Sequence, residues 1–220
     1  MAPTLEYEAV ELAHGPVVGI DEVGRGALAG PLMVGAVVID ALRDAPDGLA
    51  DSKVLTARQR EALVPLIEEW ASAVAVGVVS AREIDGWGLR VALAVATDRA
   101  LSALAMSPAR ALIDGPLNLL RPPQVMTFDT LPPLRWATLP VVNIVRGDQC
   151  AATISAAAIV AKVRRDALMR ELHVLSPLYG WRANKGYGSL EHRRALAAFG
   201  PTPWHRWTWS LPEVGSRVPA

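Results

Sequence analysis

Cysteine, histidine and long apolar runs are all scarce in this chain of 220 residues. Its single cysteine, Cys150, excludes an internal disulfide and a CxxC metal site, and its four histidines argue against zinc. The longest apolar stretches, such as PLMVGAVVI and CAATISAAAIVA, fall short of the roughly 18 residues of a membrane span. The acidic N-terminus MAPTLEYEAVELAHG lacks the basic and apolar regions of a signal peptide. We therefore expect a cytoplasmic protein with no membrane segment.

Net charge is also lacking, which by itself argues against a nucleic-acid partner. The distribution is uneven, however. Residues 1–150 hold 12 Lys and Arg against 18 Asp and Glu, a net charge of −6, whereas residues 151–220 hold 10 against 4, a net charge of +6. This asymmetry indicates a polyanion partner for the basic end and cations for some of the acids. From charge alone, an ordinary solvated surface is the simpler interpretation.

Strand-like apolar runs alternate with helical patterns along the chain. Strands are predicted over residues 17–21, 31–40, 71–80, 109–115 and 141–147. The pattern favours a mixed α/β fold.

Four helical stretches are predicted between and after these strands. Capping boxes, in which a Ser or Thr is followed three residues later by Glu or Gln, indicate helix starts at Thr56 and at Ser80, the second stretch running to about Leu104. A long Ala-rich helix is expected from about Asp148, and a short one over residues 189–199.

These elements fit one domain over residues 1–220, because a hydrophobic content of 51% supports a large core. We expect a sheet-containing core over about residues 15–148 and a helical, basic part over about residues 149–220. The irregular segment from Leu117 to Pro133 carries no pattern that predicts its structure.

Four acids lie where predicted strands end or a helix begins. Asp21 and Glu22 close the first strand, Asp114 closes the fourth, and Asp148 precedes the long helix. If these positions converge on one sheet edge, the carboxylates would repel one another unless cations such as Mg²⁺ or Mn²⁺ lay among them. Two such ions about 3.5–4 Å apart suit phosphodiester cleavage. Each acid alone also fits an ordinary turn, a solvated strand end or an N-cap.

A flexible turn, Gly24-Arg25-Gly26, follows the first pair of acids. Glycine lacks a Cβ, so its backbone N–H can approach a ligand closely. The turn is therefore a candidate for contacting a phosphate or a sugar.

An ordered series of motifs resembles the ribonuclease HII family, the type 2 ribonucleases H, from about Val17 to Arg206. The motifs are GIDEVGRGALAGP, LADSKVLTARQRE, ALIDG, GDQCAATISAAAIVAKVRRD, NKGYGSLEHRRAL and GPTPWHR. The resemblance implies a ribonuclease-H-like mixed sheet flanked by helices, with a helical C-terminal part. It also implies metal-dependent cleavage of RNA in RNA–DNA hybrids and cleavage 5′ to single ribonucleotides embedded in duplex DNA, leaving 3′-hydroxyl and 5′-phosphate ends.

The resemblance also assigns roles by motif. It makes Asp21, Glu22, Asp114 and Asp148 the metal-binding catalytic carboxylates, expected to hold two Mg²⁺ or Mn²⁺ ions in the reacting complex.

Two further elements take substrate-binding roles from the same resemblance. Gly24, Arg25 and Gly26 match the element that reads the ribose 2′-hydroxyl and the adjacent backbone. Tyr187 of KGYG matches the tyrosine that packs on the sugar beyond the ribonucleotide and senses the RNA-to-DNA junction.

Other basic and aromatic residues carry weaker expectations. Phosphate contacts are possible for Lys53, Lys162 and Lys185, although a solvated lysine is as good an interpretation of each. A diffuse basic face is expected from Arg164, Arg165, Arg193 and Arg194. Core packing is expected of the seven tryptophans. His192 and His205 are expected to be structural or close to the substrate, and not metal ligands.

The chain departs from the family pattern in three places. It has Val54 after DSK instead of a second lysine, Ala158 instead of a serine, and an aromatic tail, WHRWTW. These changes bear on substrate binding, since no carboxylate is lost.

Two alternatives to a ribonuclease HII stay open. One is a non-catalytic module that binds RNA–DNA hybrids, against which the intact acids count, because a pure binder gains nothing from acids beside a polyanion. The other is a ribonuclease HIII-like enzyme that prefers long hybrids, whose extra N-terminal domain would need more than the twenty residues that precede Asp21. We expect a monomer, and the sequence does not decide whether a replication clamp is a partner.

Overall fold

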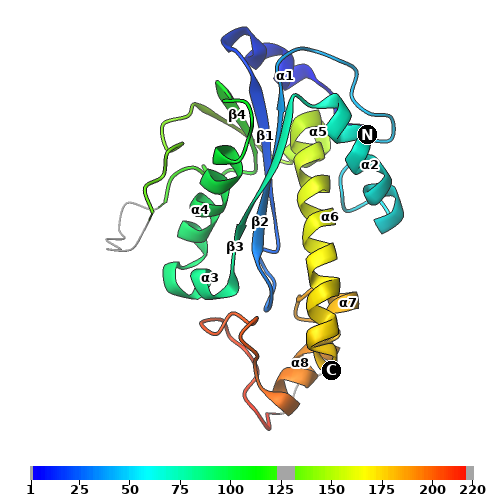
Figure 1. Cartoon of the computed structure of the whole chain (residues 1–220), viewed down its shortest axis with the longest axis vertical. Coiled ribbons are helices and arrows are strands. Elements are labelled where there is room, and N and C mark those ends of the chain that lie inside the picture. The colour runs from blue at the N-terminus through cyan, green and yellow to red at the C-terminus, as the bar shows by residue number, and fades with distance from the viewer. Residues whose placement is uncertain (1, 123–131, 217–220) are drawn as a thin grey trace.

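A five-stranded sheet forms the centre of the computed structural model, which describes residues 2–122 and 132–216 (Figure 1). The strand order is β3-β2-β1-β4-β5, with β1–β2 and β2–β3 antiparallel and β4 and β5 parallel to β1. All five strands were predicted, and their bounds are β1 (Val17–Val23), β2 (Leu32–Ile39), β3 (Ala73–Val79), β4 (Arg110–Asp114) and β5 (Val141–Ile144). Part of the segment 117–133, whose structure the sequence did not predict, lies outside the described residues.

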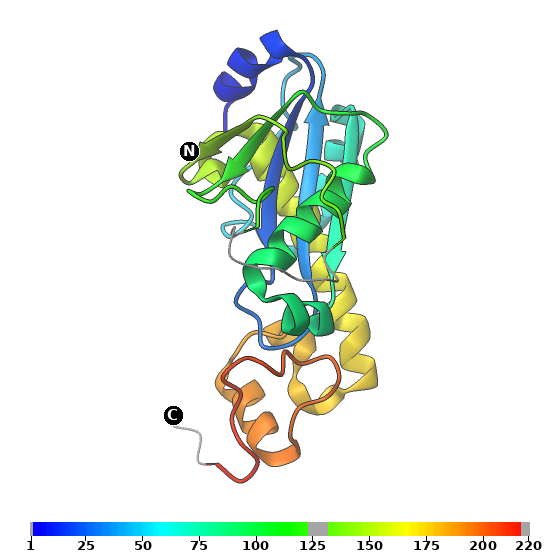
Figure 2. The same ribbon diagram turned by 90° about the vertical axis from the view of Figure 1, so that its left-hand side faces the viewer.

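Helices cover both faces of this sheet (Figures 1 and 2). The helices are α1 (Glu6–Glu11), α2 (Ala57–Trp70), α3 (Ala81–Trp87), α4 (Leu89–Ser102), α5 (Gly147–Cys150), α6 (Ala152–Leu175), α7 (Trp181–Asn184) and α8 (Leu190–Phe199). Two short 3-10 turns lie between elements: Leu12–His14 between α1 and β1, and Pro177–Tyr179 between α6 and α7. No helix within the two described ranges is long and apolar enough to cross a bilayer.

The two faces of the sheet bury different helices, because successive strand residues point to opposite sides. Val18 and Ile20 of β1 pack in one core with α3 and α4, whereas Val37 of β2 packs in a second core with α2 and α6. Helix α6 approaches β1 and β2 very closely: a Cβ at Gly19 or Gly35 would collide with the helix. The position of α6 against the sheet is therefore fixed by backbone contact.

The predicted helix starts at Thr56 and Ser80 are confirmed, each with both hydrogen bonds of its capping box. The two long helical stretches are interrupted, however. Gly88 has a φ of 74°, which separates α3 from α4. Ala151 is extended because it pairs with Thr4 in an isolated parallel bridge, so the Ala-rich helix is divided into α5 and α6.

The far half of α6 extends beyond the sheet, where α7 and α8 pack around it (Figure 1). Its core there contains Met169, Tyr179 and Trp181, all buried. Trp204 and Trp207, by contrast, are 43% and 60% exposed, so the prediction that the tryptophans pack in the core is wrong for these two. Their segment runs over the surface, where the Asp85 carboxylate accepts hydrogen bonds from the N–H of Trp207.

Candidate active site

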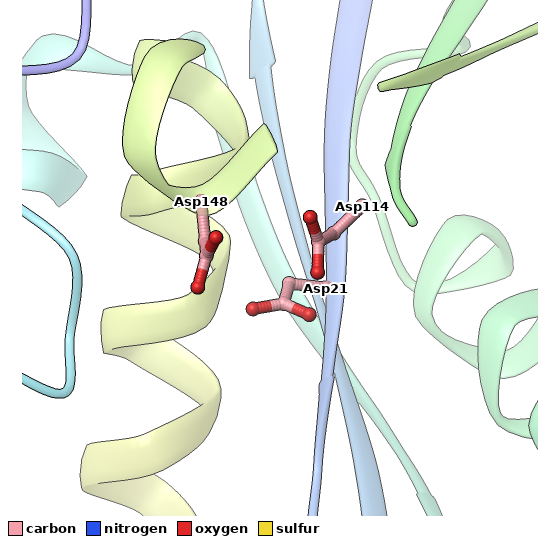
Figure 3. A group of neighbouring side chains, drawn as sticks. All are labelled: Asp21, Asp114 and Asp148. Carbon is pink, nitrogen blue, oxygen red and sulfur yellow. The ribbon is translucent and has the colours of Figure 1, made fainter. Parts of the chain in front are cut away.

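Three carboxylates from distant parts of the chain converge beside the sheet (Figure 3). One oxygen from each of Asp21, Asp114 and Asp148 lies within 4.8 Å of the others. Strands β1 and β4 are parallel neighbours, with Ile20 opposite Ile113, so Asp21 and Asp114 leave the sheet side by side. The predicted convergence is found for these three acids.

Helix α5 brings the third carboxylate to the cluster. The N–H of Gly147 donates to Oδ1 of Asp114 at 2.7 Å, which holds the start of α5 against the end of β4. Asp148 is the next residue and is only 3% exposed. It lies within α5, so it is not the N-cap of the long helix, which was the structural alternative for this residue.

Glu22, the fourth predicted acid, lies outside this group of three. It follows Asp21 at the end of β1 and is partly buried. Its carboxylate accepts a hydrogen bond from Arg25 at 3.2 Å. Burial raises the pKa of Glu22, so the Arg25 contact offsets its desolvation only in part.

The cluster carries more negative charge than its surroundings neutralise. Burial raises the pKa of Asp21 well above its usual range, and the charges of Glu22 and Asp114 add to this. Burial and then the charge of Asp148 raise the pKa of Asp114. These shifts mean that the carboxylates favour any bound positive charge.

A lysine ammonium already provides one such charge. Nζ of Lys53 lies 2.5 Å from Oδ2 of Asp148, and this hydrogen bond raises the pKa of Lys53. Lys53 is itself largely exposed, so a cation from solvent can compete for the same carboxylate. An all-oxygen donor set with excess negative charge fits hard divalent cations such as Mg²⁺ or Mn²⁺.

The Gly24-Arg25-Gly26 turn borders the carboxylates at the end of β1. Gly24 has a φ of 85°, and a Cβ there would collide with the Arg165 guanidinium. Its N–H donates to the Tyr187 hydroxyl oxygen at 3.2 Å. At Gly26 a Cβ would meet nothing within 4 Å, so this side of the turn is open to a ligand.

Two buried arginines hold the carbonyl groups of this turn and of the loop that follows it. Arg206 donates to the carbonyl oxygens of Gly24 at 2.6 Å and Arg25 at 2.9 Å, and Arg165 donates to those of Pro31 at 2.9 Å and Ala29 at 3.2 Å. The turn lies outside regular secondary structure, so its buried carbonyls need such donors. The prediction that Arg165 belongs to a diffuse basic face is therefore wrong.

The sequence contained a signal for Arg165 that charge reasoning missed. Arg165 lies four residues before Met169 and seven before Leu172, and all three are buried on one face of α6. Arg164, one position earlier, is exposed as expected and pairs with Glu68 at 3.4 Å. We find no comparable sequence signal for Arg206.

One hollow of about 410 Å³ gathers most of the predicted site residues. Nine of the eleven line it, namely Asp21, Glu22, Gly24, Arg25, Gly26, Lys53, Asp114, Lys162 and Tyr187. Ala158, one of the departures from the family pattern, lines it too, whereas Val54 is 73% exposed and does not. Three of the four predicted carboxylates, the turn and Tyr187 therefore face the same space, whereas Asp148 does not line it.

The tyrosine and two lysines differ in how they meet this hollow. The Arg165 guanidinium lies over the Tyr187 ring, 5.3 Å from its centre. Lys162 is paired with Asp166 at 2.6 Å. Lys185 does not line the hollow: its ammonium contacts the Arg182 carbonyl, and its own carbonyl binds Arg165.

His192 and His205 are fully buried, which favours the structural one of the two roles expected for them. Nδ1 of His192 donates to the Tyr187 carbonyl at 2.9 Å, and its Nε2 accepts from the Trp181 indole at 3.2 Å. Nδ1 of His205 accepts from the Thr202 N–H at 2.9 Å, so its Nε2 donates to Nε2 of His192 at 3.0 Å. Both rings are neutral in this arrangement.

Comparisons with known proteins agree on one family. The sequence matches the family model of ribonuclease HII over residues 18–211. It is 44% identical over 206 residues to the ribonuclease HII of Jannaschia sp. (strain CCS1), with 94% of each chain covered. The crystal structure of ribonuclease H2 from Pyrococcus horikoshii OT3 is similar, with a TM-score of 0.66 and 28% identity, covering 89% of this chain and 94% of that one. The ribonuclease HII of Archaeoglobus fulgidus, solved in a complex with PCNA, has a TM-score of 0.65 and 25% identity, covering 90% and 96%.

Proposed function

The chain belongs to the ribonuclease HII family and is thus a ribonuclease H, and on this premise we propose that it is a metal-dependent endoribonuclease. Its proposed substrates are RNA–DNA hybrids and DNA duplexes that contain single ribonucleotides. Its proposed cut lies 5′ to the ribonucleotide and leaves 3′-hydroxyl and 5′-phosphate ends. The observation that carries the proposal is the shared hollow, in which Asp21 and Asp114 of the carboxylate cluster face the Gly24-Arg25-Gly26 turn and Tyr187, with Asp148 directly beside them.

The carboxylates are proposed to hold the metal. Asp21, Asp114 and Asp148 would bind it directly, since their oxygens already lie within 4.8 Å of one another. Glu22 lies next to them and would join once it leaves Arg25. Two divalent cations, when bound, supply activation of a water molecule and stabilisation of the departing oxygen.

The turn and the tyrosine are proposed to select the substrate. A ribonucleotide differs from its DNA neighbours only by the 2′-hydroxyl, so recognition needs donors and acceptors held rigidly against it. Arg206 fixes the carbonyls of the turn and Arg165 fixes carbonyls of the loop just after it, which leaves the outer side of the turn free to contact the sugar and phosphate. Tyr187, held by Gly24 and Arg165, would pack on the next sugar.

Lys53, Lys162 and Lys185 are proposed to contact phosphates of the duplex. Lys53 and Lys162 line the hollow, so they are placed to do this near the carboxylates. Lys185 lies outside the hollow and would act only on a more distant phosphate.

Cleavage of an end-labelled DNA duplex with one ribonucleotide tests the proposal. The reaction is run with Mg²⁺, with Mn²⁺ and with chelator, and the cut is mapped to single-nucleotide resolution. We expect a metal-dependent cut 5′ to the ribonucleotide and none in an all-DNA duplex. Tight binding without a cut under any metal would favour the non-catalytic module, and cutting of long hybrids alone would favour a ribonuclease HIII-like preference.

Two matched variants distinguish the effect of losing a carboxylate in the site from the effect of losing one elsewhere on the protein. Asp114→Asn should abolish cleavage while the protein stays folded, because it removes a proposed metal ligand. Asp44→Asn makes the same change at an exposed residue outside the hollow, so it should cleave like the wild type. A folded, active Asp114→Asn variant would overturn the assignment.

We propose that the protein acts as a monomer in the cytoplasm. Sedimentation of the free chain tests the first part, and a stable dimer would contradict it. The Archaeoglobus relative was solved with PCNA, and this supports testing a sliding clamp as a partner of this chain.

A further inference from the structure

Glu8 is a buried acid that the proposed chemistry does not use. It lies in α1 and its side chain is fully buried. Oε1 accepts hydrogen bonds from both the N–H and the hydroxyl of Thr153, each at 2.7 Å. Oε2 is buried without a hydrogen-bond partner among the described residues. Burial of a carboxylate is costly, and it raises the pKa of Glu8.

The contact places Glu8 at the start of α6, which has no cap of its own. Ala151 occupies the N-cap position and offers no side-chain acceptor, so the first N–H groups need partners from elsewhere. Glu8, 145 positions away in the sequence, accepts the hydrogen bond from one of these N–H groups, that of Thr153. Its negative charge also suits the N-terminus of α6, a helix of 24 residues, where the helix dipole is positive.

The backbone just before Glu8 holds the same junction. The N–H of Thr4 donates to the Cys150 carbonyl at 2.9 Å, and the N–H of Ala152 donates to the Thr4 carbonyl at 2.9 Å. Residues 4–8 therefore bind both sides of Ala151, the extended residue between α5 and α6.

This junction sets the place of one member of the carboxylate cluster. Asp148 belongs to α5, a helix of four residues that ends at Cys150. On the other side, Thr153 lies against Gly19 of β1, where a Cβ would collide with it. Asp21 follows two residues later on the same strand. Thr153 is thus fixed between Glu8 and the strand that carries the partner carboxylate.

We propose that Glu8 is a positioning residue for the carboxylate cluster: by holding Thr153 at the start of α6, it keeps Asp148 at the right separation from Asp21. This inference rests on the proposed function of the cluster as a metal site. It assigns Glu8 no contact with metal or substrate.

Metal affinity tests this role directly, with a neighbouring acid as control. Mn²⁺ alone is titrated calorimetrically into the folded wild type, Glu8→Ala and Glu11→Ala. Glu11 lies on the same helix and pairs with Arg110 at 3.6 Å, away from α6. Replacing a residue that orients a metal ligand without touching the metal typically lowers metal affinity by about 10- to 100-fold. We expect a loss of that size for Glu8→Ala and wild-type affinity for Glu11→Ala.

Conservative variants and kinetics distinguish the positioning role from a purely structural one. Glu8→Gln keeps an oxygen that can accept both Thr153 hydrogen bonds, so it should restore most of the affinity. If Glu8→Ala does not fold, Thr153→Ala removes only the hydroxyl donor and should weaken Mn²⁺ binding in the same direction. In cleavage assays the metal concentration for half-maximal rate should rise, with KM for the duplex unchanged at saturating metal.

The outcomes distinguish this inference from the proposed function. Folded Glu8→Ala with a lower Tm but wild-type Mn²⁺ affinity would overturn the positioning role and leave the proposed function intact. A wild type that binds no Mn²⁺ and cuts no duplex would overturn the proposed function, and the positioning role with it.

Discussion

The hydroxyl oxygen of Tyr187 accepts a hydrogen bond from the N–H of Gly24 at 3.2 Å, although the two residues lie 163 positions apart. The tyrosine proposed to sense the junction and the turn proposed to read the ribose are therefore in direct contact. Two variants separate the contributions of the ring and the hydroxyl.

Tyr187→Ala removes the ring and should lose more activity on a single embedded ribonucleotide than on a continuous hybrid. Tyr187→Phe removes only the bond to Gly24, a neutral hydrogen bond of about 0.5–1.5 kcal/mol, so its loss of kcat/KM should be about tenfold or less. Both are measured as kcat/KM on the two substrates. An equal loss on both substrates for Tyr187→Ala would contradict junction sensing.

The two glycines of the turn should respond differently to substitution by alanine. Gly24→Ala places a Cβ against Arg165 at a φ of 85°, so it should destabilise the protein by about 1–3 kcal/mol in urea unfolding. Gly26→Ala meets no protein atom within 4 Å, so stability should not change. Its Cβ instead enters space proposed for the ribose, so KM should rise. A Gly26→Ala variant with unchanged KM would show that the ribose does not approach this residue.

Asp21→Asn should stabilise the metal-free protein while abolishing cleavage. The folded-state pKa of Asp21 is raised above its unfolded value, so its contribution to stability is lost as pH rises through the folded pKa. At neutral pH the charge is therefore destabilising, and the neutral amide relieves it. Thermal unfolding at pH 7 with chelator should show a higher Tm for Asp21→Asn.

Added Mg²⁺ provides the control for that comparison. Ligand at 100 times its Kd stabilises a folded protein by about 2.7 kcal/mol, so wild-type Tm should rise with Mg²⁺. Asp21→Asn should show little of this rise, because it lacks a proposed ligand. A lower metal-free Tm for the variant than for the wild type would mean that the Asp21 carboxylate stabilises the fold.

The histidine pair should make the protein sensitive to acid. Burial lowers the pKa of His205 to about 4, and burial also lowers that of His192. Both histidines contribute stability above the unfolded pKa near 6.5, and this is lost as pH falls toward their folded pKa values. A proton on either acceptor nitrogen would break its bond to Trp181, Thr202 or the other ring.

Urea unfolding between pH 7 and pH 5 measures this loss. Each buried neutral histidine contributes up to about 1.4 kcal/mol per pH unit, so the wild type should weaken steeply. His205→Gln lacks one of these groups and should be less stable at pH 7 but show a shallower slope. Equal slopes for the two proteins would mean that His205 does not titrate on unfolding.

Local patterns predicted the elements well because their causes are local. The capping boxes at Thr56 and Ser80 place both hydrogen bonds within four residues, so they can be recognised directly in the sequence. The convergence of Asp21 and Asp114 followed from the strand-end rule, and the parallel pairing of β1 and β4 bears it out.

The features that sequence reasoning missed depend on distant partners. Charge alone places Arg165 on a basic face, but its role is set by the carbonyls of Pro31 and Ala29, 134 and 136 positions away. Ala151 has good helix propensity, yet its pairing with Thr4 keeps it extended. Glu8 precedes the sheet in a segment with no recognised motif, and only its contact with Thr153 in the folded protein points to a role for it.

Helix α6 and strand β1 run side by side in the same direction, and two close contacts mark the ends of the site: Thr153 against Gly19 of β1, and Arg165 against Gly24 just after the strand. Twelve helical residues span about 18 Å and five extended residues span about 17 Å, so the two intervals match in length. One contact lies beside the carboxylates and the other beneath the turn. An inserted residue in this part of α6 would rotate everything after it by about 100° and carry Arg165 away from the turn. The interval can accept substitutions, but it cannot change its number of residues without uncoupling the two ends of the site.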